Sequence, residues 1–202
     1  MDSSIIITFA IPLFFGLILI EFFYGVITKQ NNYRINDAIT SMSLGLISRF
    51  VPILGLGFQY VVYKAVAEHY NLKLLSGEEI WVWVTAFILY DICYYWMHRI
   101  HHEIKVFWAT HVVHHHGEEF NLATALRQTS TGFLWKWVFF LPLFIIGIPP
   151  QMYVTVAGLN LVYQFWVHTE HIGRLGFLEY IFVTPSNHRV HHLSLIHISE
   201  PT

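Results

Sequence analysis

Histidines recur in this sequence at spacings that place their side chains together on helices. A pair four residues apart is followed by the pattern His-x-x-His-His, and this pattern returns near the C-terminus. Because residues three and four apart share one face of a helix, each group is suited to present several imidazoles to a metal ion. The candidate ligands are His98, His102, His111, His114, His115, His168, His188, His191 and His192.

The number of these histidines predicts more than one metal ion. Histidine makes up 14 of 202 residues. At that frequency the pattern His-x-x-His-His is expected by chance about (14/202)³ × 198 ≈ 0.07 times, yet it occurs twice. Nine imidazoles exceed the needs of one ion, so we expect two ions with four or five nitrogens each. Imidazole suits iron, zinc, copper and nickel alike, so the spacing alone does not select the metal.

Three further histidines stand apart from the candidate ligands. His116 lies one step round the helix from the stripe, and we expect it not to bind metal. His69 is isolated in an acidic loop and is expected at the surface. His171 remains open as a ligand.

The composition is typical of a membrane protein. Hydrophobic residues make up 55% and charged residues 12%, against about 25% charged residues in soluble domains. We expect a single domain of this size, with Cys93 in its core, because a free cysteine in an apolar run packs as a small hydrophobe. A net charge of −2 gives no reason to expect a nucleic-acid partner.

Five apolar segments predict an all-α, polytopic membrane helical bundle with a cytoplasmic, histidine-rich helical cap that holds the di-metal site. The expected spans are residues 5–20, 41–66, 80–97, 133–148 and 151–167. The second is broken by Pro52 and two glycines, and the third is expected to continue as a helix through Glu103. The prolines at 149 and 150 predict a tight turn between the last two spans. Five crossings put the basic loops and every histidine group on the cytoplasmic side.

Polar residues inside the apolar segments are expected to point toward the site. Asp91 lies within the third span, where a carboxylate should face protein rather than lipid. Two roles stay open for it, a structural hydrogen bond or an outer partner of a ligand histidine. Asn160, Gln164 and His168 form a polar stripe on the fifth segment, and His171 continues it.

Several motifs together resemble the fatty acid hydroxylase/sterol desaturase superfamily of integral-membrane di-iron enzymes. The matching words are Asp91-x-x-Tyr-Tyr-Trp-x-His-Arg-x-x-His-Glu, His111-x-x-His-His, Phe165-x-x-His-Thr-Glu and Thr184-Pro-Ser-x-His-Arg-Val-His-His. The resemblance extends over residues 81–192. Within the superfamily, residues 118–128 most resemble the alkylglycerol monooxygenase sub-group.

The resemblance implies an oxidoreductase with two histidine-ligated iron ions, O₂ as co-substrate, and a lipid whose C–H bond is oxidised. The lipid is a sterol, a fatty acyl chain or an alkylglycerol ether, and the outcome is hydroxylation, desaturation or ether cleavage. The electron donor is cytochrome b5, a ferredoxin or tetrahydrobiopterin. The nine histidines take the ligand role. Asp91, Glu103 and Glu170 are candidates for orienting ligand imidazoles from outside the metal shell.

The resemblance also divides the chain. Residues 1–79 are expected to form N-terminal membrane helices and residues 80–192 the catalytic region, in the bacterial inner membrane or the endoplasmic reticulum. After His192 the sequence departs from the family's pattern. We therefore expect residues 193–202, His197 included, to be a non-native tail on a shortened chain.

Two other functions are consistent with parts of the pattern. A membrane metal transporter or metal-binding protein is also rich in histidine, but its ligands are expected within the spans along a pathway. A b-type haem electron carrier needs axial histidines on facing helices, and it leaves the two His-x-x-His-His patterns unexplained.

Overall fold

The computed structural model describes residues 3–53, 58–75 and 77–197, and within these residues it is all-helical with no strand, as the sequence predicts. The α-helices in chain order are α1 (Ser3–Thr28), α2 (Ile35–Ile53), α3 (Gln59–His69), α4 (Ile80–Glu103), α5 (Lys105–His115), α6 (Leu141–Ile146), α7 (Pro150–Trp166) and α8 (Pro185–His197). Short 3-10 helices are η1 (Thr124–Leu126), η2 (Gly132–Leu134), η3 (Lys136–Phe140) and η4 (Gly176–Tyr180).

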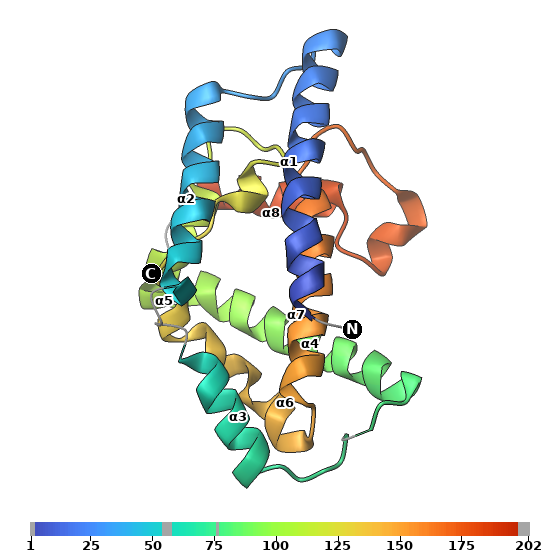
Figure 1. Ribbon diagram of the computed structural model, residues 1–202. Coiled ribbons are helices and arrows are strands. Elements are labelled where there is room, and N and C mark those ends of the chain that lie inside the picture. Colours follow the sequence, from blue (N-terminus) through green and yellow to red (C-terminus); the bar gives the residue numbers. More distant parts are fainter. Residues whose placement is uncertain (1–2, 54–57, 76, 198–202) are drawn as a thin grey trace.

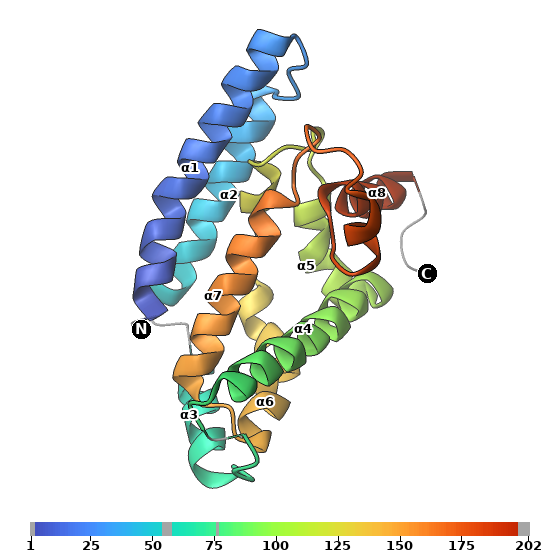
Figure 2. The same cartoon turned by 90° about the vertical axis from the view of Figure 1, so that its right-hand side faces the viewer.

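The helices form two groups joined by α4 and α7 (Figures 1 and 2). Helices α1 and α2 run antiparallel along one side, and α7 packs along α1. Helix α4 runs diagonally from the end that holds α3 and α6 toward α5 and α8 (Figure 2). Because α5 follows α4 after a single residue and packs back on it, the histidines of both helices are brought to one place.

The larger core lies where α3, α4, α6 and α7 meet. Val82, Ala86 and Tyr90 are four residues apart on α4 and share its buried face. They pack with Phe144 of α6 and Val156 of α7 in one cluster of buried side chains. Removal of this apolar surface from water holds α3, α4, α6 and α7 together.

Helix α1 buries only one narrow face. The rings of Phe14 and Phe165 stack with centroids 3.9 Å apart, and this contact fixes α1 against α7. The opposite face is apolar and open, with Phe9 71% and Ile27 79% exposed. Such a surface suits contact with lipid. Among the described residues two helical stretches, Phe9–Thr28 and Ile80–Glu103, are long and apolar enough to cross a membrane.

The predicted second span is wrong as a single helix. Helix α2 begins six residues earlier than expected and ends at Ile53, and α3 begins at Gln59. The two helices pack on different neighbours, α2 on η1 and α3 on α6 and α7. Pro52 near the end of α2 lacks an amide hydrogen, which favours a helix end over a continuation.

The predicted fourth span is also not one α-helix. Its first part is the 3-10 helix η3, and α6 is only six residues long. Pro142 lies in the first turn of α6, where its missing N–H costs nothing, and Gly147 ends the helix at φ +123°, a conformation that favours glycine. The tight turn that follows and α7, within one residue of the predicted fifth segment, agree with the sequence prediction.

A buried carboxylate ties α1 to the region around the histidines. Glu21 accepts hydrogen bonds from the backbone N–H of Leu122 at 2.8 Å and from the hydroxyls of Tyr33 and Thr169. Thr169 directly follows the candidate ligand His168. The expected N-terminal membrane helix therefore also contributes to the alignment of the site, because a buried carboxylate is stable only with such donors.

Replacing Glu21 with alanine is expected to lower the free energy of unfolding by about 3 kcal/mol, because it leaves buried donors, the Leu122 N–H among them, without an acceptor. The measurement is the apparent unfolding temperature in detergent. Glu68→Ala is the matched control, since Glu68 makes only an exposed ion pair with Lys64. Equal unfolding temperatures for the two variants would contradict this role of Glu21.

Candidate metal centre and its pocket

All nine histidines predicted as ligands converge into two groups. In each group the candidate ligand nitrogens lie within 4.8 Å of one another. The first group is His98, His102, His111, His115 and His191. The second group is His114, His168, His188 and His192. The division into five and four matches the number of nitrogens that the sequence predicts for two ions.

The distances between ring nitrogens fit metal coordination. Neighbouring Nε2 atoms lie 2.9 to 3.1 Å apart in the five-histidine group and 2.9 to 3.2 Å apart in the four-histidine group. With metal–nitrogen bonds of about 2.1 Å at about 90 to 109°, two ligand nitrogens lie roughly 3.0 to 3.4 Å apart. The donor set thus fits two metal ions, one held by each group.

Each His-x-x-His-His pattern serves both groups, which corrects the prediction that its three histidines share one face and one ion. On α5, His111 and His115 join the five-histidine group, and His114 joins the other. On α8 the assignment is reversed, because His188 and His192 join the four-histidine group while His191 crosses to the first. Positions three and four residues along a helix differ by about 100° in direction, so they diverge toward separate centres.

Backbone carbonyls fix the orientation of two rings in the four-histidine group. His114 donates from Nδ1 to the carbonyl oxygen of Arg127 at 3.1 Å, and His168 donates from Nδ1 to that of Gln164 at 2.7 Å. A carbonyl only accepts, so Nδ1 carries the proton and Nε2 offers its lone pair to the group's centre. In the other group, the buried Nδ1 atoms of His102 and His115 have no hydrogen-bond partner, and both rings pack on Trp108.

Arg127 is buried and supports the site from outside the histidine groups. Its guanidinium donates to Asp37 and Ser41 of α2 and to the carbonyl oxygen of Val113. Its own carbonyl accepts from His114. The sequence gives no signal for this pairing, because Arg127 and Asp37 are 90 positions apart.

Burial keeps the ligand candidates outside α4 neutral. It lowers the pKa of His168 and of His191 to about 4. Burial, reinforced by neighbouring imidazoles, lowers the pKa of His111, His188 and His192 well below the usual value. Neutral imidazole is the form that binds metal, so at neutral pH these rings are ready to act as ligands.

The carboxylates expected near the site lie elsewhere. Asp91 is exposed on α4, which contradicts the expectation that it faces protein. It lies one position, or about 100°, from the buried Tyr90. Glu103 is exposed and pairs with Arg99 at 2.7 Å, and Glu170 is exposed as well. Neither Asp91 nor Glu103 belongs to a histidine group or lines the adjacent pocket, and backbone carbonyls take the orienting role instead.

Four further histidines lie outside both groups, two of them exposed and two wholly or partly buried. His116 caps the end of α5 and is exposed, as expected, and so is His69. His171 lies outside both groups and packs against Tyr24. His101 was not singled out from the sequence. It is 1% exposed and donates from Nδ1 to the Met97 carbonyl oxygen, and its buried Nε2 has no partner.

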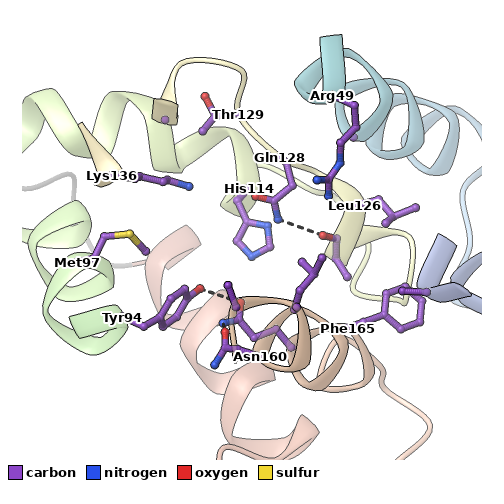
Figure 3. Close-up of a pocket in the computed structure, with 18 of the residues that line it drawn as sticks. Arg49, Tyr94, Met97, His114, Leu126, Gln128, Thr129, Lys136, Asn160 and Phe165 are labelled. Atoms are coloured by element: carbon purple, nitrogen blue, oxygen red, sulfur yellow. Dashed lines mark hydrogen bonds between the residues drawn. The ribbon is translucent and has the colours of Figure 1, made fainter. Parts of the chain in front are cut away.

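A cavity of about 630 Å³ adjoins both histidine groups (Figure 3). Its walls come from α1, α2, α4, α7 and residues 125–140, and they are mainly apolar and aromatic. The histidines on its wall are His98, His101, His111, His114, His168 and His188. Tyr94 donates to Gln164, which donates to Asn160, so the predicted polar stripe of α7 does face the site.

Residues 83–197 match the family model described as fatty acid hydroxylase. This match covers more than half of the chain and includes all nine ligand candidates. The chain therefore belongs to the fatty acid hydroxylase family, as the sequence motifs indicate. No solved structure matches the chain.

Among curated proteins, the chain is 42% identical over 184 residues to the alkylglycerol monooxygenases of Homo sapiens and Danio rerio. These alignments cover 91% of the chain and 41% of each relative, so the chain spans about two fifths of their length. A more distant relative is the ornithine lipid hydroxylase OlsE of Rhizobium tropici, 25% identical over 121 residues, which are 56% of the chain and 34% of that protein.

The unequal size of the two groups predicts unequal effects of losing one ligand. The wild-type chain produced with iron is expected to hold about two transition-metal ions. His188→Ala leaves three imidazoles in its group and is expected to reduce the content to about one ion, whereas His102→Ala leaves four and is expected to retain more metal. The measurement is elemental analysis of purified, folded protein.

His116→Ala is the matched control, because it removes an exposed imidazole next to the ligands and should leave the metal content unchanged. A wild-type content near zero or one in folded protein would contradict the two-ion centre. Two tightly bound ions in His188→Ala would contradict the ligand assignment.

Proposed function

We propose that this chain carries the catalytic region of a membrane-bound, iron- and O₂-dependent monooxygenase that oxidises a C–H bond of a lipid. One observation carries the proposal: two groups of neutral imidazoles form part of the wall of an apolar cavity. A metal centre against such a cavity suits chemistry on an apolar chain rather than on a water-soluble substrate.

The nine histidines would hold the two ions through Nε2, and family membership favours iron among the metals that imidazole suits. When bound, iron supplies the O₂ chemistry, which belongs to the cofactor. The protein's part is to hold the lipid and exclude water. Phe14, Phe165 and Phe140 line the cavity for an alkyl chain, and Tyr94, Gln164 and Asn160 offer polar atoms beside it.

The substrate is proposed to be an alkylglycerol ether, as in the name of the relatives with 42% identity. Sterols and fatty acyl chains are the other classes that the resemblance implies. Monooxygenation places one oxygen atom of O₂ in the product and reduces the other to water, so two electrons must come from a donor. Cytochrome b5, a ferredoxin and tetrahydrobiopterin are the donor types that the resemblance implies.

The membrane arrangement is part of the proposal. The exposed apolar face of α1 and the length of α4 support insertion in a bilayer. We propose a polytopic bundle with the histidine-bearing side in the cytoplasm, on the charge bias of the loops. Residues 80–192 would form the catalytic region and residues 1–79 the N-terminal membrane part.

A metal transporter is a weaker reading. Its ligands should follow one another along a pathway through the spans. Here the nine rings are gathered into two compact groups, drawn from α4, α5 and α8 together with His168 just after α7.

Iron-loaded chain in lipid nanodiscs, supplied with a reductant and ¹⁸O₂, is expected to convert a 1-O-alkylglycerol into a product that contains one ¹⁸O atom, measured by mass spectrometry. His188→Ala is expected to abolish turnover, because an incomplete ligand set leaves the centre unable to complete the reaction.

His116→Ala is the control and should retain turnover close to that of the wild type. Absence of labelled product from sterol, fatty acyl and ether substrates, with two irons bound and a competent reductant, would contradict the proposed function. Full activity in His188→Ala would contradict the placement of the reaction at this centre.

A further inference from the structure

The charged side chains of the cavity are of one sign. Among the described residues that line it, Lys136 and Arg49 are the charged ones apart from histidine, and no aspartate or glutamate lines it. The cavity is otherwise apolar or carries neutral polar groups. Two cations on an apolar surface, with no carboxylate to balance them, leave the cavity complementary to a ligand that brings a negative charge.

Lys136 is placed to contact such a ligand. It begins the 3-10 helix η3, and its side chain reaches into the cavity (Figure 3). It makes no hydrogen bond or ion pair with the described residues, whereas Lys64 at the surface pairs with Glu68. A partly buried ammonium group without an anion is costly. A ligand anion would offset that cost.

Arg49 enters the same cavity from α2, on another wall (Figure 3). It also has no ion pair among the described residues. Other arginines of the described chain also make no ion pair, and the Arg49 residue is exposed at the rim of the cavity. The guanidinium therefore keeps its fork of donors available, and this fork matches the oxygens of a carboxylate or phosphate.

The cationic end of the cavity lies beside the metal centre. Lys136 is near enough to His98 and His114 to interact with them electrostatically. In Figure 3 its ammonium group points toward the space above His114, with Gln128 and Arg49 on the far side. The rest of the cavity wall includes the apolar side chains of Phe14 on α1 and of Phe165 and Leu161 on α7. One cavity thus offers cations for a headgroup and apolar side chains for an alkyl chain.

We infer that the cavity binds single-chain lipids with an anionic headgroup, a carboxylate or a phosphate, and that Lys136 and Arg49 hold this headgroup. The preferred alkylglycerol would then be one whose glycerol carries a phosphate, and the neutral 1-O-alkylglycerol would bind more weakly. The carbons next to the headgroup then lie nearest the histidine wall. These carbons are the ones we expect to be oxidised, a statement that rests on the proposed function. The binding of an anionic headgroup does not rest on it.

Competition binding to the metal-loaded chain in detergent tests the inference without turnover. The probes are palmitate and hexadecyl phosphate as anions, and hexadecanol as a neutral lipid of equal chain length, each displacing a fluorescent fatty acid. Charge-assisted hydrogen bonds predict roughly 10- to 100-fold tighter binding of the anions. In Lys136→Met/Arg49→Met this preference is expected to fall below about threefold, with hexadecanol binding unchanged.

Matched variants separate a lost contact from a lost fold. Lys136→Arg keeps the charge and should retain most of the preference. Lys105→Met removes an exposed cation that does not line the cavity and should retain all of it. Metal content equal to that of the wild type shows that a variant is folded, since the ligands come from several helices.

Further probes identify the source of the anion. Inorganic phosphate and vesicles of a diacyl phosphatidylglycerol should not displace the fluorescent lipid, because the former lacks a chain and the latter has two. Displacement by either, equal affinity for hexadecanol and palmitate in the wild type, or an unchanged preference in the double methionine variant would overturn the inference. Selective binding without any lipid oxidation would instead contradict the proposed function alone.

Discussion

Nine uncharged imidazoles are held with their Nε2 atoms about as close as metal ligands lie, and the rest of the structure serves this arrangement. Lone pairs packed 2.9 to 3.2 Å apart have no mutual attraction unless a proton or a cation lies between them. Burial disfavours the charged, protonated form of these rings and so lowers their pKa. A metal cation at each centre would resolve both constraints. Helices α5 and α8 contribute histidines to both groups, so the two groups form as one unit.

The framework around the centres uses buried charge where apolar packing would not fix direction. Arg127 joins α2 to α5 through Asp37 and the carbonyl oxygen of Val113, and its own carbonyl sets the ring of His114. Glu21 joins α1 to Leu122 and to Thr169 beside His168. A buried charge with specific donors or acceptors permits few arrangements, so these contacts constrain orientation more tightly than apolar contact does. The helices that face lipid in the proposed arrangement thereby also position the histidines.

The cavity brings lipid and metal together within the same helices. Apolar side chains of α1 and α7 line it, among them the stacked pair Phe14 and Phe165, and its histidines come from α4, α5 and α8 together with His168 just after α7. The membership of the chain in the fatty acid hydroxylase family accounts for the metal centre. Lys136 and Arg49 are the cations of this cavity, and in the arrangement we infer they orient a lipid by holding its headgroup.

The sequence by itself determined which nine histidines gather as candidate ligands, the extent of α4 to Glu103, the turn before α7 and the helical class, because these depend on spacing within single helices and on proline and glycine. Only the tertiary structure decided which histidine joins which centre, since His114 and His191 diverge from their neighbours and their partners lie on other helices. It also placed Asp91 and Glu103 on the exposed surface and split the second and fourth segments. Pairings such as Arg127 with Asp37 join distant positions, and spacing along one helix holds no information about them.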